Sequence, residues 1–263
     1  PTVLNLNSND IKLLSEDRIP EDFPSDKMVI PSQVKFKSID GVEVYATKFE
    51  RDDIKKNKPA VIYIHGGPPR QMLLGWHYSS YYSNAYALNQ YLANKGFVVI
   101  SVNYRLGIGY GYEFHNPIDG GTKGASEYKD VKAAGIWLNS QKNIDKDRIY
   151  VYGGSYGGYA TMAGLTFTPD LYAAGINYVG VVDLELLQED SNRNSRRFGG
   201  FYDELRLEWG DPDDPADMEY IIETSPLRQA HKIKSPVLIM HGAQDNNVRL
   251  VLSLIHISEP TRR

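Results

Sequence analysis

The sequence contains no cysteine. A chain without cysteine forms no disulfide, no thiolate zinc site and no cysteine nucleophile, so any covalent catalysis must use another side chain. Long apolar runs are absent too: stretches such as 97–102 (FVVISV) are far too short to span a bilayer, and no signal-peptide pattern opens the chain. The first residue is proline, so we expect the natural amino terminus to lie upstream, and the compartment stays open.

Runs of basic residues are also absent. The formal net charge is -4, from 29 Lys and Arg against 33 Asp and Glu. This balance argues against nucleic acid or an anionic membrane as the main partner, and we expect a small or peptidic molecule instead. The length of 263 residues fits one α/β domain with a sizeable core. Nothing in the composition indicates an oligomeric state.

Short apolar strands alternate with helical segments along most of the chain. A β-hairpin is expected over 34–50, followed by strands at 60–65, 97–105, 148–152, 175–182 and 236–240. The expected helices are 81–96, 125–141 and 157–167. This alternation predicts a mostly parallel sheet with helices on both faces. Residues 183–234 break the pattern and are expected to form a loop and helical excursion beside the site.

The stretch RIYVYGGSYGGYATMAG contains the pattern Gly153-x-Ser155-x-Gly157. G-x-S-x-G alone is a weak signal, because glycine and serine are common. Here it directly follows an apolar strand and directly precedes a helical segment, which is the setting of a nucleophile elbow. Flanking glycines permit a sharp reversal that lifts the serine Oγ out of the sheet. We therefore predict that Ser155 is a nucleophile; the alternative is an ordinary glycine turn.

A nucleophile of this kind needs hydrogen-bond donors for the developing oxyanion. The backbone N–H of Tyr156 is one candidate, and the loop His65-Gly66-Gly67-Pro68, after the strand at 60–65, supplies others. Glycines allow the backbone to approach a substrate oxygen closely, and each such donor contributes about 3 kcal/mol in the transition state. The alternative is a plain loop stiffened by prolines.

An acid is expected after a later strand. Asp245 lies just after the strand at 236–240, in the chain order that α/β-hydrolases use. Asp183, after the strand at 175–182, is the rival candidate, and either carboxylate could instead be a solvated loop residue.

Together these motifs resemble the prolyl oligopeptidase family of serine peptidases, particularly its acylaminoacyl-peptidase and dipeptidyl-peptidase-like branches. The resemblance rests on HGGPPRQM, VNYRLGIGYG, GASEYKDV, GGSYGGYATM, LEWGDP and SPLRQAHKIKSPVLIMHGAQDNNV, which occur in family order. It implies an α/β-hydrolase fold and hydrolysis of peptide bonds through an acyl-enzyme. The residues it implies are Ser155 as nucleophile, Asp245 as acid, Gly66, Gly67 and Tyr156 at the oxyanion hole, and Asn247 as a contact to a substrate carbonyl.

The resemblance also divides the chain into three parts. Residues 1–33 look like the end of a β-propeller and its connection, and 34–250 look like an incomplete catalytic domain. Residues 251–263 are similar to peptide strings translated from sequencing adaptors, so we expect a foreign or disordered tail. In the family the catalytic histidine follows the acid beyond a further helix and strand. Only 18 residues follow Asp245, so we expect the last strand and the histidine loop to be missing.

The histidines fit this chain order poorly. Five of them precede the acid, and a single one follows it within the unusual tail: His65, His77, His115, His231 and His241, then His256. Without a histidine to take its proton, a serine is a weak nucleophile, so we expect this chain by itself to be close to inactive. The alternative is that His256 serves as a relocated base.

Two other functions share these motifs. One is an esterase or lipase acting on small acyl esters, and the other is a non-catalytic binding module that keeps the hydrolase pocket. A cofactor is not expected: no Gly-Lys-Ser/Thr follows the glycine-rich turn, and no histidine and carboxylate cluster has metal-ligand spacing.

Overall fold

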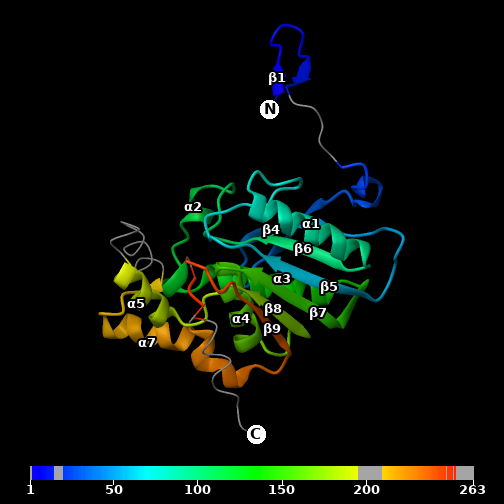
Figure 1. The fold of residues 1–263 in the computed structure, drawn as a ribbon. Coiled ribbons are helices and arrows are strands. Elements are labelled where there is room, and N and C mark those ends of the chain that lie inside the picture. The colour runs from blue at the N-terminus through cyan, green and yellow to red at the C-terminus, as the bar shows by residue number, and fades with distance from the viewer. Residues whose placement is uncertain (1, 15–19, 195–208, 247, 251, 253–263) are drawn as a thin grey trace.

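The computed structural model describes residues 2–14, 20–194, 209–246, 248–250 and 252. In this part of the chain a seven-stranded sheet has the order β3-β4-β6-β5-β7-β8-β9 (Figure 1). Its strands are β3 (Ser32–Lys37), β4 (Glu43–Phe49), β5 (Lys58–Ile64), β6 (Val98–Asn103), β7 (Ile144–Gly154), β8 (Ala174–Tyr178) and β9 (Val237–Met240). β4 is antiparallel to β3 and β6, and the other pairings are parallel, which confirms the predicted α/β class.

Helices connect most of the parallel strands. They are α1 (Ser80–Asn94), α2 (Tyr112–His115), α3 (Ser126–Ser140), α4 (Tyr156–Phe167), α5 (Leu184–Asn194) and α7 (Pro215–Thr224), with short 3₁₀ turns η1 (Ser25–Lys27), η2 (Gly121–Lys123) and η4 (Pro226–Lys232). The segment between β8 and β9 is the predicted excursion, and its described residues include α5, α7 and η4. The short α2 and η2 turns were not expected from the sequence.

Side chains of the central strand β5 alternate between two apolar layers. Ala60, Ile62 and Ile64 join the largest core cluster, to which α3 and α4 contribute. Val61 points to the other side, where it packs with Tyr86 of α1. The near-continuous apolar sequence of β5 therefore reflects burial on both faces of a parallel sheet.

The predicted hairpin forms between β3 and β4. Gly41 has φ +88° at the turn, and the Ser38 N–H donates to the Val42 carbonyl at 2.8 Å. Its positive φ is the reason that glycine follows Asp40 here.

The α1 side of the sheet is only partly covered. Over β8 and β9, four apolar side chains are exposed by 39%, 42%, 54% and 47%: Ile176, Tyr178, Leu238 and Met240. Register pairs Ile176 with Leu238 and Tyr178 with Met240, so the four are contiguous. We call them the open apolar face; a groove of about 290 Å³, lined by β5, α1, β7 and β8, adjoins it.

Strand β8 is shorter than expected. The sequence predicts a strand over 175–182, but β8 ends at Tyr178. The next residue, Val179, has φ +47°, and its N–H donates to the Met240 carbonyl at 2.8 Å. A left-handed residue cannot continue a strand, so the apolar run 179–182 leaves the sheet and turns toward α5.

The first 33 residues, for which the sequence predicts no regular structure, contain a small hairpin. β1 (Thr2–Leu4) pairs antiparallel with β2 (Ile11–Leu13), and Figure 1 shows this hairpin apart from the sheet. Nearer the body, the Val29 N–H donates to Gln90 Oε1 at 2.9 Å, and Gln90 Nε2 donates back to the Val29 carbonyl at 2.8 Å. The assignment of 1–33 as a propeller end and of 251–263 as a tail stays a prediction.

Candidate active site

Ser155 stands at a sharp turn between the last residue of β7 and the first residue of α4. Its φ is +57° and its ψ is -122°, a conformation that costs a non-glycine residue about 1–3 kcal/mol. The Ser155 N–H donates to the Tyr178 carbonyl at 3.0 Å, and its carbonyl accepts from Gly158 and Tyr159 at 2.9 and 3.1 Å. These backbone bonds hold the strained residue in place on both sides.

The glycines flanking Ser155 are required by space. An ideal Cβ on Gly153 would lie 2.3 Å from the Gly157 carbonyl oxygen, and one on Gly157 would lie 2.1 Å from the Ile64 carbonyl oxygen. Real Cβ atoms do not approach so closely, so neither position accepts a side chain without movement of the backbone. The predicted reason for glycine at both flanks is therefore present in the geometry.

The serine hydroxyl is available for chemistry. Within the described part of the chain no side chain or backbone group makes a hydrogen bond to Ser155 Oγ. Ser155 is also the N-cap residue of α4, so the positive end of that helix lies at the predicted nucleophile. This end favours an anion that develops beside the serine.

The glycine loop after β5 lies against the elbow. An ideal Cβ on Gly66 would be 3.3 Å from Ser155 Cβ and 3.0 Å from the Gly154 carbonyl oxygen, so Gly66 is beside Ser155. Gly67 follows with φ +125°, and its peptide bond to Pro68 is cis. The two predicted oxyanion elements, this loop and the amino end of α4 at Tyr156, thus meet at Ser155.

A buried aromatic network lies beneath both elements. The Tyr104 hydroxyl donates to the His65 carbonyl at 2.8 Å, and its ring stacks on His65 and Tyr156 with centroids 4.2 and 5.9 Å away. The Tyr156 hydroxyl donates to Glu127 Oε1 at 3.2 Å. Burial raises the pKa of the Glu127 carboxyl. Tyr104 therefore connects the glycine loop to the start of α4.

His65 is neutral in this network. It is fully buried, and burial lowers its pKa to about 4. Its Nδ1 lies 2.8 Å from the Gly66 carbonyl, so this nitrogen donates. The ring therefore supports the glycine loop at neutral pH without carrying charge.

Asp245 lies in a turn beyond β9 and is half-buried. Its N–H donates to the Gly242 carbonyl at 3.2 Å, and its Oδ1 accepts from the Val248 N–H at 3.0 Å. The charge of Asp245 contributes to the raised pKa of Tyr81, whose hydroxyl abuts Gly154. Tyr81 therefore has its hydroxyl next to the residue that precedes Ser155 and within reach of the charge of Asp245.

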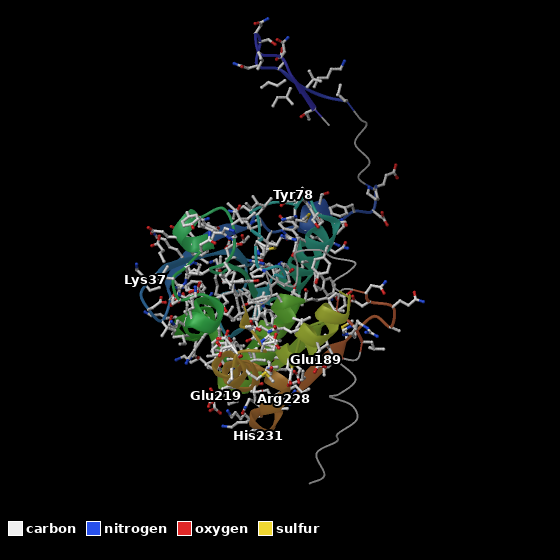
Figure 2. All side chains as sticks on the ribbon, turned by 90° about the vertical axis from the view of Figure 1, so that its left-hand side faces the viewer. Lys37, Tyr78, Glu189, Glu219, Arg228 and His231 are labelled. Carbon is white, nitrogen blue, oxygen red and sulfur yellow. The ribbon has the colours of Figure 1, made fainter. Side chains whose placement is uncertain are left out.

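The rival carboxylate, Asp183, is buried and bonded to neighbouring groups. It is 3% exposed, its Oδ1 accepts from the Leu186 N–H at 3.1 Å, and its Oδ2 accepts from Arg228 Nε at 2.7 Å. It caps the amino end of α5 and holds Arg228, which Figure 2 labels on the lower part of the molecule. Both of its oxygens are thus used in local structure.

A family model decides the relationship. The model described as the prolyl oligopeptidase family matches residues 83–259, which is more than half of the chain. The chain belongs to the prolyl oligopeptidase family.

Similar proteins and solved structures support this membership. Dipeptidyl aminopeptidase BIII from Pseudoxanthomonas mexicana is 39% identical over 191 residues, covering 73% of this chain and 26% of that protein. The uncomplexed acylaminoacyl peptidase of Pyrococcus horikoshii has a TM-score of 0.69 at 27% identity, covering 87% of this chain and 34% of the other. A Mycobacterium tuberculosis puromycin-hydrolyzing peptidase has a TM-score of 0.80 at 22% identity, covering 98% and 37%, which shows the fold alone. The chain thus spans 26% to 37% of these proteins.

These findings confirm the predicted family and its α/β-hydrolase fold. The relatives are serine peptidases, as the motif order indicates. They leave the roles of individual site residues as predictions. Asn247 and His256 lie outside the described residues.

None of the histidines in the described residues is paired with Ser155. Three of them use ring nitrogens for backbone groups: His77 Nδ1 accepts from the Ser79 N–H at 2.9 Å, His115 Nδ1 is 2.9 Å from the Leu106 carbonyl, and His241 Nε2 is 2.7 Å from the Val248 carbonyl. His65 is described above, and His231 is exposed near the bottom of Figure 2. Among these five, none makes a hydrogen bond to Ser155.

Sequence reasoning missed Tyr81, Tyr104 and Glu127. Glu127 falls within GASEYKDV, a motif used for the family resemblance without a role for the carboxyl. The tyrosines belong to a chain with 19 of them, so no spacing separates these two from the others. Across the described residues no group of histidines and carboxylates is arranged to hold a metal ion, and no helix is long and apolar enough to cross a membrane.

Proposed function

We propose that this chain supplies the hydrolase site of a serine peptidase, with Ser155 as the nucleophile. The observation that carries the proposal is the strained Ser155, φ +57°, held between β7 and α4 by backbone bonds and by glycines that tolerate no side chain. Strain of this kind persists only where the surrounding structure fixes it, and it is concentrated at active sites. Membership of the prolyl oligopeptidase family supports peptide bonds as the substrate class.

The reaction follows from the geometry around Ser155. Its Oγ attacks the carbonyl carbon of the peptide bond while a base removes the hydroxyl proton. The carbonyl oxygen becomes an oxyanion, which the backbone N–H groups of Tyr156 and of the Gly66-Gly67 loop stabilise by hydrogen bonds. The base then protonates the leaving amine as the C–N bond breaks, which leaves an acyl-enzyme at Ser155. Water attacks this ester and regenerates the serine.

Asp245 is the proposed acid, whose carboxylate orients the base and stabilises its charged form. It follows the last described strand, whereas Asp183 is engaged by Arg228 and by the start of α5. By family resemblance Asn247, two residues further on, contacts a substrate carbonyl.

The proposed base is a histidine other than the five described ones. Each of those is held by backbone groups, buried beneath the glycine loop, or exposed on η4. The sixth, His256, falls in the tail that does not resemble the family, so we propose that the 263-residue chain by itself has little hydrolase activity. The proposed catalytic part is 34–250, with 1–33 as its connection to a preceding propeller.

Covalent labelling tests the nucleophile and the base together. The chain is treated with an alkyl fluorophosphonate, with and without imidazole as an added base, and the adduct is measured by intact mass. We expect slow labelling alone and faster labelling with imidazole, lost in Ser155→Ala and kept in Ser140→Ala, an exposed serine at the end of α3. Circular dichroism confirms that each variant is folded.

The outcomes separate the two claims. Rapid stoichiometric labelling at Ser155 without imidazole shows that this chain contains a working base, and His256 is then the first residue to replace. No labelling of the folded chain, even with imidazole, contradicts the nucleophile and favours a binding module on the same fold. Where labelling occurs, turnover of an amide and an ester with the same acyl group distinguishes a peptidase from an esterase.

A further inference from the structure

Two adjacent tyrosines at the start of α1 place their hydroxyl groups at two different glycines beside Ser155. The Tyr82 hydroxyl lies 3.5 Å from an ideal Cβ on Gly66, the glycine of the oxyanion loop. The Tyr81 hydroxyl lies against Gly154, the residue that precedes the nucleophile. The two rings are perpendicular, with an interplanar angle of 87°. One hydroxyl therefore lies at the proposed oxyanion loop, and the other lies at the residue that precedes Ser155.

Gly154 lacks a side chain because Tyr81 occupies its place. An ideal Cβ on Gly154 would be 1.9 Å from Tyr81 Oη and 3.2 Å from Tyr178 Cδ1. Gly154 does not have a positive φ, so its backbone conformation does not require glycine. A side chain at 154 would instead have to displace the Tyr81 hydroxyl, the end of a movable side chain, and press on the Tyr178 ring. Tyr81 thus takes the position beside the nucleophile that a side chain at 154 would otherwise fill.

Asp245 lies near enough to Tyr81 for its charge to act on the tyrosine hydroxyl. Burial is the main cause that raises the pKa of Tyr81 to about 12, and the charge of Asp245 adds to it. In a serine hydrolase the acid orients the base, and the base delivers its proton to the leaving group. On the proposed mechanism the leaving group therefore departs near Asp245 and its neighbour Tyr81, whereas the Gly66 loop receives the acyl oxygen.

Tyr81 and Tyr178 present a shared aromatic surface there. Their rings are nearly parallel, at 16°, with centroids 6.4 Å apart. They remain 39% and 42% exposed, so both are accessible beside the elbow. Within the described part of the chain the Tyr81 hydroxyl makes no hydrogen bond. Tyr178 is also fixed relative to the nucleophile, because its carbonyl accepts the Ser155 N–H.

We propose that Tyr81 and Tyr178 form a leaving-group subsite that contacts an aromatic or large apolar group on the departing side of the cleaved bond. Tyr81 and Tyr178 are specificity-determining residues in this proposal, which rests on the proposed function of Ser155. The contact is made by the rings, since aromatic groups pack in offset or edge-to-face arrangements with centroids about 4.5–7 Å apart.

Two reagents that differ only in their leaving group test the subsite. An alkyl fluorophosphonate releases fluoride, and the 4-nitrophenyl phosphonate of the same alkyl group releases an aromatic phenolate. Both are applied with imidazole present, and the ratio of their rate constants for labelling Ser155 is measured by intact mass. We expect the ratio of aryl to fluoride reagent to fall about fivefold in Tyr81→Ala and to stay within about twofold in Tyr81→Phe, which keeps the ring.

Tyr78→Ala is the matched control. Tyr78 precedes α1 by two residues, is 82% exposed and is labelled at the upper edge of the main body in Figure 2. Its replacement is expected to keep the ratio. An unchanged ratio in Tyr81→Ala, or an equal fall in Tyr78→Ala, overturns the subsite. Failure of both reagents to label Ser155 overturns the proposed function instead, so the two failures are distinguishable.

A stability measurement tests the placement without any chemistry. Gly154→Ala is expected to lower the urea midpoint of unfolding, because the new Cβ meets the Tyr81 hydroxyl. In a Tyr81→Ala background the same change should lower the midpoint much less. Equal losses in the two backgrounds contradict the contact between residues 81 and 154.

Discussion

Two turns at the carboxyl edge of the sheet carry the proposed chemistry, and they are built very differently. The elbow at Ser155 follows β7, which lies inside the sheet between β5 and β8, and carbonyl oxygens crowd its glycines at 2.3 and 2.1 Å from an ideal Cβ. The turn at Asp245 follows β9, an edge of the described sheet, and a Cβ on Gly242 would meet nothing within 4 Å. Ser155 is therefore fixed by close packing around its glycines, whereas the turn that leads to Asp245 has open space at Gly242.

Glycine is therefore present for different reasons in the two turns. At 153 and 157 a side chain would collide with neighbouring carbonyl oxygens, whereas at 242 there is open space around the residue. Strain can be stored only at the first kind of turn, because stored strain requires surroundings that resist relaxation.

The largest expected effect comes from adding one methyl group to each turn. Gly157→Ala brings a Cβ within 2.1 Å of the Ile64 carbonyl oxygen, and we expect it to lower the free energy of unfolding by about 3–5 kcal/mol. Gly242→Ala is the matched change and should stay within about 0.5 kcal/mol. Urea unfolding followed by circular dichroism measures both. Similar losses at the two positions would show that the contrast between the turns is wrong.

The elbow side should also carry a pH dependence. His65 has a pKa of about 4 when folded and its usual 6.5 when unfolded, so between these values the unfolded chain binds the extra proton. Stability from this group is therefore lost as the pH falls, by about 2 kcal/mol between pH 7 and pH 5. Urea unfolding at several pH values should show that His65→Gln removes this part of the slope. An identical slope in the variant contradicts a neutral buried ring.

The two carboxylates provide a smaller, opposite pair of effects. Asp183→Ala removes the helix cap and the partner of Arg228, and should cost about 1–2 kcal/mol of unfolding free energy. Asp245→Asn keeps an acceptor for Val248 and should cost less than about 0.5 kcal/mol. Labelling of Ser155 with imidazole should instead fall at least about tenfold in Asp245→Asn, because the carboxylate no longer stabilises the imidazolium. If Asp183→Ala reduces the labelling and Asp245→Asn does not, Asp183 is the acid.

The smallest effect on stability is expected at the open apolar face. Leu238 and Met240 are 54% and 47% exposed, so replacing them with Lys and Glu should change the free energy of unfolding by less than about 0.5 kcal/mol. The same double variant should reduce self-association of the purified chain, because an exposed apolar edge strand pairs readily with another chain. Size-exclusion chromatography over a concentration series measures this. Unchanged elution of the variant and the parent contradicts it.

The contrast between the turns also explains what the sequence could predict. Gly153, Ser155 and Gly157 are adjacent in the chain, and their requirement is local, so a short pattern identifies the elbow. The strand β5 was predictable for the same reason, since its apolar run is short and bounded by glycine. The family resemblance follows from several such local motifs in order, and the family model agrees with it.

Contacts between distant segments could not be predicted in this way. Tyr81 meets Gly154 across 73 positions of sequence, and no spacing rule connects a helix start to the residue before a nucleophile. The predicted end of β8 was wrong. Residues 179–182 have the apolar composition of a strand, but Val179 is left-handed and its N–H is bonded to Met240 of another strand. The structural use of Asp183 likewise depends on Arg228, far along the chain.

The bond between Val179 and Met240 has a consequence for alternative registers of β9. Each residue of this strand is apolar, so a slip by one position would exchange Val237 and Ile239 with Leu238 and Met240 at little hydrophobic cost. Such a slip would displace the following turn by about 3.3 Å along the strand, enough to move Asp245 out of hydrogen-bond reach of a base. Two main-chain bonds, Val179 to Met240 and Gly175 to Pro236, bracket the strand and oppose this shift. The position of Asp245 thus depends on backbone pairing, and on the proposed mechanism a slipped population would be folded but inactive.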